Sequence, residues 1–250
     1  MEIVLLTALG VGGATVIGAA IGFLFKRASH TFSDIILSFA AGVMLSAAII
    51  GLIIPSIESS ENWWGILVTV LGVFVGALCL NFVDRLVPHL HKMIGSDTEE
   101  HNNKGLNRIL LFVTAIAIHN LPEGIAAGVG FVSDPTQGLI IAGGIALQNI
   151  PEGMVIIAPM LAAGVKPRRT FMIAAFTGVV EVIGTLIGYF AAGISSAVLP
   201  FALAFAGGTM LYVISDEMIP ETHAHGHERG ATYALLVGFC VMLVTDFLLG

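Results

Sequence analysis

Three acidic residues stand in the interior of long apolar runs, where an ionisable side chain is costly. Glu123, Glu152 and Glu181 each lie near the middle of such a run, whereas all ten Lys and Arg residues lie at run ends or between runs. A carboxylate in hydrocarbon is strongly unfavourable unless it is paired, hydrated or bound to a cation. Ion pairs with Lys or Arg are excluded here, so three explanations remain. These are protonated carboxyls hydrogen-bonded between helices, a water-filled cavity, or a bound cation.

Two of these carboxylates belong to a hexad that occurs twice in the chain. The copies are His119-Asn120-Leu121-Pro122-Glu123-Gly124 and Gln148-Asn149-Ile150-Pro151-Glu152-Gly153. Residues four apart share one face of a helix, so the first side chain of each hexad lies over its glutamate, with the asparagine beside them. The hexads stand in consecutive antiparallel runs, near the middle of each, and can present their polar groups at one depth.

The side chains of the two hexads form a mixed donor set. One imidazole, several carboxylates and amide oxygens suit Zn²⁺, Fe²⁺, Mn²⁺ and their neighbours better than Ca²⁺ or Mg²⁺, which prefer shells made of oxygen alone. The sequence therefore predicts a site for a divalent transition-metal ion that is shared between two helices.

The elements that must position these groups are membrane-spanning helices. Hydrophobic residues make up 56% of the 250 residues, charged residues 11%, and the mean hydropathy is +0.96, whereas an average soluble domain carries about 25% charged residues. The 17 acidic residues outnumber the ten basic ones, which excludes the basic surface of a nucleic-acid-binding protein. Eight apolar runs reach the ~20 residues that a spanning helix needs, and none alternates with a period of two as barrel strands do. The runs lie at about 3–25, 34–54, 64–87, 108–130, 138–163, 170–192, 198–219 and 231–249.

The sequence thus predicts an all-α membrane protein with eight transmembrane helices. The first run has no basic segment before it, which favours a retained span over a cleaved signal peptide. Cys79 and Cys240 lie far apart inside apolar runs, and we expect them to be small buried hydrophobic residues.

The placement of the basic residues predicts the orientation of these helices. All ten lie in or beside odd-numbered connections: Lys26, Arg27, Arg85, Lys92, Lys104, Arg108, Lys166, Arg168, Arg169 and Arg229. The positive-inside rule places that face in the cytoplasm, so both termini are expected to be extracytoplasmic. The longest connection, residues 88–107, is expected to be a mobile cytoplasmic loop.

The order of the spans together with the two hexads resembles the ZIP (Zrt/Irt-like) family of divalent metal-ion transporters, and in particular its compact prokaryotic GufA-like and ZupT-like members. The resemblance implies a binuclear metal site at the midplane, between the second, fourth, fifth and sixth helices, in the plasma (inner) membrane of a prokaryote. One ion would bind His119, Glu123, Gln148 and Glu152, with Met44 as a soft ligand. The other would bind Asn120, Asn149 and Glu181, with Glu123 and Glu152 bridging the two ions. Some relatives carry Asp at the position of Asn149, so this chain has one carboxylate fewer there.

A second polar cluster lies at the cytoplasmic end of the seventh run. It comprises Asp216, Glu217, Glu221 and His223, and the resemblance implies that these residues lie along the exit path of the metal. Other histidines lie in the cytoplasmic connections, where they either transfer metal or are solvated surface residues: His89, His91, His101, His225 and His227.

These observations predict a single transport domain over residues 1–250 that imports divalent transition-metal ions into the cytoplasm. Zn²⁺ is the first expectation, followed by Fe²⁺, Mn²⁺ and Cd²⁺, with the metal as substrate and no catalytic cofactor. The resemblance implies alternating access, in which the hexad helices move as a block against the rest, like an elevator. We expect glycines to permit close sliding of the helices, for instance Gly42, Gly76, Gly178 and Gly184. The partners are the lipid bilayer and, from the resemblance alone, a second copy of the chain.

Two alternatives remain open at this point. An intramembrane metal-dependent hydrolase would use the same ligands to activate water, but the chain has no HExxH motif. A proton-coupled carrier of an organic substrate would use the glutamates as proton relays, but no Lys or Arg lies at the midplane to hold an anionic substrate. The chain also lacks a G-x-x-x-x-G-K-[ST] loop, so no nucleotide is expected. Metal dependence of the flux separates both alternatives from metal transport.

Overall fold

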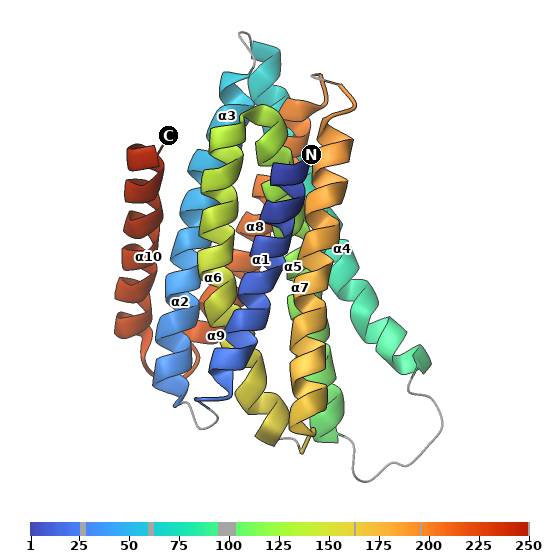
Figure 1. The fold of residues 1–250 in the computed structure, drawn as a ribbon, viewed down its shortest axis with the longest axis vertical. Coiled ribbons are helices and arrows are strands. Elements are labelled where there is room, and N and C mark those ends of the chain that lie inside the picture. Colours follow the sequence, from blue (N-terminus) through green and yellow to red (C-terminus); the bar gives the residue numbers. More distant parts are fainter. Residues whose placement is uncertain (26–28, 60–62, 95–103, 163, 196, 250) are drawn as a thin grey trace.

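The computed structural model is a bundle of long helices joined by short connections (Figure 1). It describes residues 1–25, 29–59, 63–94, 104–162, 164–195 and 197–249, without the side chains of residues 84 and 86–116. Within these ranges every regular element is a helix. In chain order they are α1 (Glu2–Gly22), α2 (His30–Ser46), η1 (Ala47–Ile53), α3 (Ile54–Glu58), α4 (Trp63–Ile94), α5 (Lys104–Ser133), α6 (Pro135–Ala162), α7 (Pro167–Ala192), α8 (Leu199–Val213), η2 (Ile214–Met218), α9 (Ile219–Thr222) and α10 (Glu228–Leu249).

The prediction of an all-α membrane protein is confirmed. Seven helical segments of the described part are long and apolar enough to cross a membrane, and α5 is a further long helix whose first half has no described side chains. The α2–η1–α3 and α8–η2–α9 segments each form one continuous span. Helix α4 continues to Ile94, beyond the predicted end at residue 87, and α5 begins at Lys104. The predicted loop 88–107 is therefore shorter than expected, and its centre, residues 95–103, lies outside the described residues.

Two of the spans contain a π-helical segment that the sequence did not predict. Segment η1 follows α2 directly, and η2 follows α8 and carries Asp216 and Glu217. A π turn hydrogen-bonds five residues along the chain and so accommodates an extra residue in the helix, often at a functional site. In this chain both acidic residues of η2 line a cavity that is described below.

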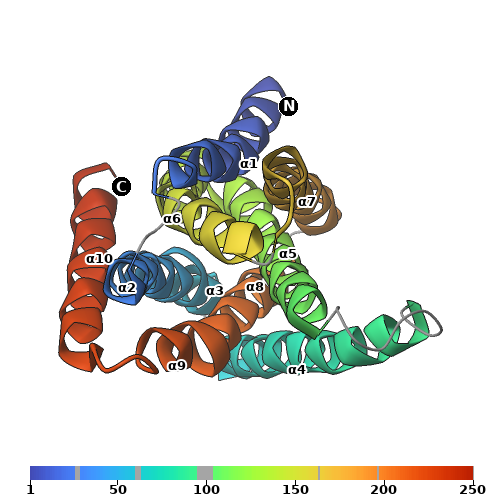
Figure 2. The same ribbon diagram turned by 90° about the horizontal axis from the view of Figure 1, so that it is seen from below.

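The helices are arranged in two halves. Helices α1, α5, α6 and α7 pack on one another and contain both hexads, and we call them the hexad half. Helices α2, α3, α4, α8, α9 and α10, with η1 and η2, form the frame half. Viewed along the bundle, the hexad half lies on one side and the frame half surrounds it on two others (Figure 2). The chain passes between the halves three times, after α1, α4 and α7.

Glycines bring helix backbones into direct contact within each half. A Cβ at Gly124 of α5 would overlap the Glu181 carbonyl in α7, and one at Gly178 of α7 would overlap the Gly12 carbonyl in α1. In the frame half, Gly42 meets the backbone of α10 and Gly76 the backbone of α8. The expectation that these glycines permit sliding is wrong, because each lies inside one half and fixes two helices against each other.

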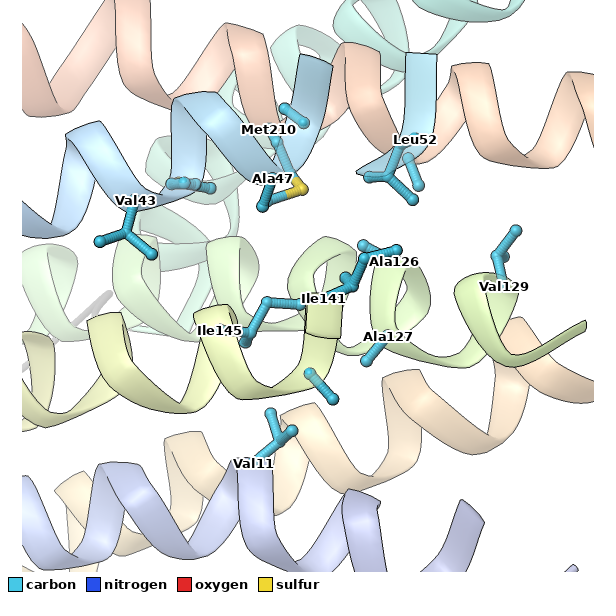
Figure 3. Close-up of a cluster of buried hydrophobic side chains, with 14 of the residues drawn as sticks. Val11, Val43, Ala47, Leu52, Ala126, Ala127, Val129, Ile141, Ile145 and Met210 are labelled. Atoms are coloured by element: carbon cyan, nitrogen blue, oxygen red, sulfur yellow. The ribbon is translucent and has the colours of Figure 1, made fainter. Parts of the chain in front are cut away.

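The boundary between the halves consists of side chains instead. A Cβ at Gly51 of η1 would lie 2.8 Å from Cγ1 of Ile141, and one at Gly144 of α6 would lie 2.7 Å from Sδ of Met242 in α10. Figure 3 shows this apolar layer, in which side chains of α2, η1 and α8 face those of α5 and α6. The ends of flexible side chains can shift more easily than backbones in direct contact, so the contacts at this boundary differ in kind from those inside each half.

The expectation for the two cysteines is wrong. Cys79 in α4 and Cys240 in α10 are exposed and form no disulfide. In a membrane protein the bilayer surrounds the bundle with hydrocarbon, so an apolar residue has no need to be covered by protein.

Candidate metal site

The hexads occupy the interior of the hexad half, on α5 and α6. Both helices continue through their central prolines, Pro122 and Pro151. Four hexad side chains are completely buried: Asn120, Glu123, Gln148 and Asn149. His119 and Glu152 keep 8% and 7% exposure. The first four side chains are thus enclosed by helices, while the last two are the only hexad ligand candidates open to the surroundings.

The structure brings the three midplane carboxylates together. Glu123 lies close enough to Glu152 and Glu181 for their charges to interact, and Gln148 lies beside Glu123. Like charges in an environment of low dielectric destabilise one another strongly. This cluster therefore requires compensation by protonation, hydrogen-bond donors, water or a cation.

Several polar atoms of the hexads have no hydrogen-bond partner among the described residues. They are both carboxylate oxygens of Glu123, both amide atoms of Gln148, and the Oδ1 atoms of Asn120 and Asn149. Buried polar atoms in folded proteins are nearly always hydrogen-bonded, so a group of unsatisfied atoms indicates a missing partner. Most of these atoms are oxygens, which matches the needs of a divalent cation.

Glu181 has a different environment, since three donors surround it. Oγ1 of Thr15 lies 2.6 Å from Oε1, Nδ2 of Asn149 lies 2.6 Å from Oε2, and Nδ2 of Asn120 donates to Oε1. Asn149 also donates to the carbonyl oxygen of Val11 at 3.2 Å. These bonds join α1, α5, α6 and α7 at one point.

A cavity of about 370 Å³ leads away from the hexads between the two halves. His119 and Glu152 line it from the hexad half, and Asp216, Glu217 and Glu221 line it from η2 and α9. Nε2 of His119 lies 2.6 Å from Oε1 of Glu217, which bridges the two halves. The remaining walls are mainly apolar: Leu37, Val155, Val213, Met218 and Pro220. Two of the predicted metal residues, His119 and Glu152, thus share one cavity with three of the predicted exit residues.

The described histidines of the α9–α10 connection are not among the residues that line this cavity. His223 contacts the Ile219 carbonyl oxygen at 2.9 Å and Oγ1 of Thr232 at 3.2 Å. His225 lies 3.1 Å from Oδ1 of the buried Asp34, and His227 contacts Thr31. These contacts join the α9–α10 connection to the start of α2. His89, His91 and His101 lie outside the residues whose side chains are described.

Met44 is completely buried in the large apolar cluster.

Among the described residues, no three His, Cys, Asp or Glu side chains converge closely enough to hold a metal ion. His119 is already hydrogen-bonded to Glu217, and Glu181 is hydrogen-bonded to its three donors. A metal ion would therefore draw on the amide oxygens of the hexads or require His119 to turn from Glu217.

Two polar residues of the site were missed in the sequence. Thr15 is one of two threonines in the apolar α1, and its partner lies 166 residues away. Tyr212 donates to Oδ2 of Asp216 at 3.1 Å and accepts from Asn81 at 2.7 Å. Neither belongs to a motif, so only the packing of the helices reveals them.

Comparison with known proteins identifies related sequences. The sequence model of the family described as "ZIP Zinc transporter" matches residues 89–246. The chain is 46% identical to the zinc transporter GufA of Myxococcus xanthus over 72% of this chain and 70% of that protein. It is 37% identical to the zinc transporter ZIPB of Bordetella bronchiseptica, over 95% of this chain and 78% of that one. It is 34% identical to the zinc transporter ZupT of Chlorobaculum parvum, over 94% and 92% of the two chains.

These relatives cover both hexads, and they are transporters rather than enzymes. The membrane-spanning helices and the bacterial relatives make the protein a multi-pass integral protein of a prokaryotic plasma membrane. The doubled hexad, the helical bundle and the match over most of the sequence lead to one conclusion: the chain belongs to the ZIP zinc transporter family.

Proposed function

We propose that this protein imports divalent transition-metal ions, with Zn²⁺ as the main substrate and Fe²⁺, Mn²⁺ and Cd²⁺ as further ones. The observation that carries this proposal is the cavity of about 370 Å³, because it connects the hexads to a second group of acidic side chains. A dication that leaves Glu152 therefore meets Asp216, Glu217 and Glu221 next. The relatives named above are zinc transporters, which supports the choice of ion.

The transported ion would bind to side chains of both hexads. His119, Glu123, Gln148 and Glu152 supply one imidazole nitrogen, two carboxylates and an amide oxygen, which is a donor set that suits Zn²⁺. The unsatisfied oxygens of Glu123 and Gln148 support this assignment. Met44 is an additional soft ligand in this proposal. A second ion, bound by Asn120, Asn149 and Glu181 with the two glutamates bridging, stays a prediction from the resemblance.

The direction of transport follows from the proposed orientation. Both termini lie toward one end of the bundle, and α9 lies toward the other (Figure 1). Basic residues flank the connections at the α9 end, for instance Lys166, Arg168 and Arg169, which favours that end as the cytoplasmic one. The cavity runs from the hexads to α9. We therefore assign this conformation to the stage at which the ion is released into the cytoplasm, with Asp216, Glu217, Glu221 and His223 along the exit.

Alternating access would arise from movement of the hexad half against the frame half. Backbone contacts at glycines hold each half together, whereas apolar side chains separate the two halves. A displacement along this boundary would carry the hexads from one side of the membrane to the other without unfolding either half. Homodimerisation stays a prediction from the resemblance.

The proposal is tested by metal flux into proteoliposomes. We compare Zn²⁺, Fe²⁺, Mn²⁺ and Cd²⁺ for the wild type, for Glu152→Gln and for the control Glu58→Gln, which changes an exposed glutamate outside the cavity. Saturable influx is expected for the wild type and the control, with a loss of about 100-fold or more in Glu152→Gln, since the variant removes a charged ligand. Equal flux in all three proteins would contradict transport through the hexads.

A further inference from the structure

Glu181 differs from the two hexad carboxylates in how its charge is balanced. Its donors come from three other helices: Thr15 on α1, Asn120 on α5 and Asn149 on α6. All four side chains are completely buried. Both oxygens of Glu181 accept hydrogen bonds, whereas both oxygens of Glu123 have no partner.

This arrangement stabilises a carboxylate without a cation. A threonine hydroxyl and two amide N–H groups all donate to the same group, and hydrogen bonds to an ionised acceptor are about twice as strong as those between neutral groups. The two carboxylates in the hexads have no comparable set of donors, since Glu123 has no hydrogen-bond partner and Glu152 lines the cavity. The three donors occupy three of the roughly four acceptor positions of this carboxylate, two on Oε1 and one on Oε2, so an ion placed at Glu181 would compete with them.

The identity of residue 149 decides which arrangement forms. An asparagine can turn its N–H group toward a carboxylate, and Asn149 does so at 2.6 Å from Oε2 of Glu181. An ionised aspartate has acceptors only, so at this position it would bring a second negative charge against Glu181. A cation would then be needed to hold the two carboxylates together.

The same hydrogen bonds orient the amide oxygens. Because Asn120 and Asn149 direct Nδ2 at Glu181, their Oδ1 atoms face away from it, and both are buried and without a partner. They join the oxygens of Glu123 and Gln148 in the set of unsatisfied groups.

We propose that the midplane of this protein binds one divalent ion rather than two, and that Thr15, Asn120 and Asn149 hold Glu181 in place of the second ion. This inference rests on the proposed function, since it concerns the same metal site. Thr15 is a positioning residue: it holds Glu181, and through Glu181 it sets the orientation of the two amides. The hydrogen bonds from these donors to Glu181 also join the four helices of the hexad half. They therefore take the place of a second ion in two ways: they stabilise the charge of Glu181, and they hold the helices together.

The test is the Zn²⁺ content of the purified protein at equilibrium dialysis, measured by elemental analysis. Zinc also binds elsewhere, for instance at the histidines of the connections. To correct for it, we subtract the Zn²⁺ content of the Glu123→Gln/Glu152→Gln double variant from that of each protein. We expect a difference of one ion per chain for the wild type and two for Asn149→Asp. Adding Glu181→Gln to Asn149→Asp is expected to return the value to one. If Asn149→Asp does not fold, Asn120→Asp provides the same gain of a carboxylate beside Glu181.

Each possible number of midplane Zn²⁺ ions per chain leads to a different conclusion. Two midplane ions in the wild type would overturn this inference and leave the proposed function intact. A value of zero would overturn both. One ion in the wild type and still one in both folded aspartate variants would also overturn it, because residues 120 and 149 would then have no influence on the number of ions.

The role of Thr15 is tested with a matched pair of variants. Thr15→Val removes the donor to Glu181, whereas Thr177→Val removes an equally buried hydroxyl that bonds only the Ala174 carbonyl oxygen of its own helix. We expect Zn²⁺ to bind at least about tenfold more weakly to Thr15→Val, as for loss of other groups that orient metal ligands. Thr177→Val and the conservative Thr15→Ser should bind normally. Equal Zn²⁺ affinity in Thr15→Val and Thr177→Val would overturn the assignment of Thr15.

Discussion

His119 and Gln148 occupy the same position in the two hexads but have different environments. Gln148 is completely buried with no partner, whereas His119 lines the cavity and lies 2.6 Å from Glu217 of the other half. In the proposed transport cycle His119 can therefore bind the ion in one conformation and Glu217 in another. In that proposal, the contact between them would correspond to the step at which the ion passes to the exit residues.

At the scale of single residues, His119→Ala is expected to change the ion preference of transport. The variant removes the one nitrogen donor and leaves oxygens, so the preference should move from Zn²⁺ toward Mn²⁺, which favours oxygen ligands. Competition between the two ions for flux into proteoliposomes measures this directly. An unchanged ranking would remove His119 from the metal ligands.

Glu217→Gln is expected to slow the release of the ion. The variant keeps a hydrogen-bonding group beside His119 but removes the negative charge that attracts the ion into the cavity. Flux at saturating Zn²⁺ should fall by about tenfold, while equilibrium Zn²⁺ affinity changes by less than about twofold. Glu228→Gln, in the exposed start of α10, is the control. A loss of affinity as large as the loss of flux would place Glu217 among the binding ligands instead.

At the scale of the helices, glycines determine which contacts are rigid. A Cβ at Gly124 would meet the backbone of α7. A Cβ at the exposed Gly143 of α6 would have no neighbouring atom within 4 Å. Both stand inside helices of the same half. The pair therefore separates the cost of the close approach from the general effect of glycine on a helix.

Gly124→Ala is expected to lower the free energy of unfolding by about 1–3 kcal/mol, because the new methyl group forces α5 and α7 apart. Gly143→Ala should be neutral or stabilising, since alanine favours a helix over glycine by about 1 kcal/mol. Thermal unfolding in detergent compares the two. Equal melting temperatures would contradict the tight packing of α5 on α7.

The sequence was informative where a feature is local. Run length predicts the spanning helices, and the cost of a charge in hydrocarbon singles out Glu123, Glu152 and Glu181 without any structure. The π segments, the hydrogen bond of Thr15 and the separation into halves could not be predicted this way. They depend on contacts between helices far apart in the chain, and an apolar residue has the same sequence signature whether it faces lipid or protein. The two cysteines show the same ambiguity.

At the scale of the whole molecule, the two halves should move relative to each other, and cross-links can test this. Gly51 and Ile141 face each other across the boundary between the halves, whereas Gly22 and Ile157 face each other within the hexad half. In each pair a Cβ added at the glycine would lie less than 3 Å from Cγ1 of the isoleucine, at 2.8 Å for Gly51 and 2.7 Å for Gly22, so the two pairs are matched close sites for a disulfide. The background carries Cys79→Ser and Cys240→Ser, which remove the two exposed thiols.

Oxidation of the variant with Gly51→Cys and Ile141→Cys is expected to stop Zn²⁺ flux, and reduction should restore it, because the cross-link fixes one half on the other. The variant with Gly22→Cys and Ile157→Cys should keep its flux when oxidised. Mass spectrometry checks that both disulfides have formed. Full flux through the completely oxidised 51–141 variant would contradict a relative movement of the halves.

The order of the residues around Glu181 also affects how the protein is made. Thr15, Asn120 and Asn149 all precede Glu181 in the chain, and synthesis begins at the N-terminus. The three donors are therefore translated, and their helices enter the membrane, before the carboxylate does. When α7 emerges from the ribosome, a charge that is costly in hydrocarbon meets a nearly complete set of partners. A chain in which the acidic helix came first would expose that charge to lipid for the time taken to synthesise the other three.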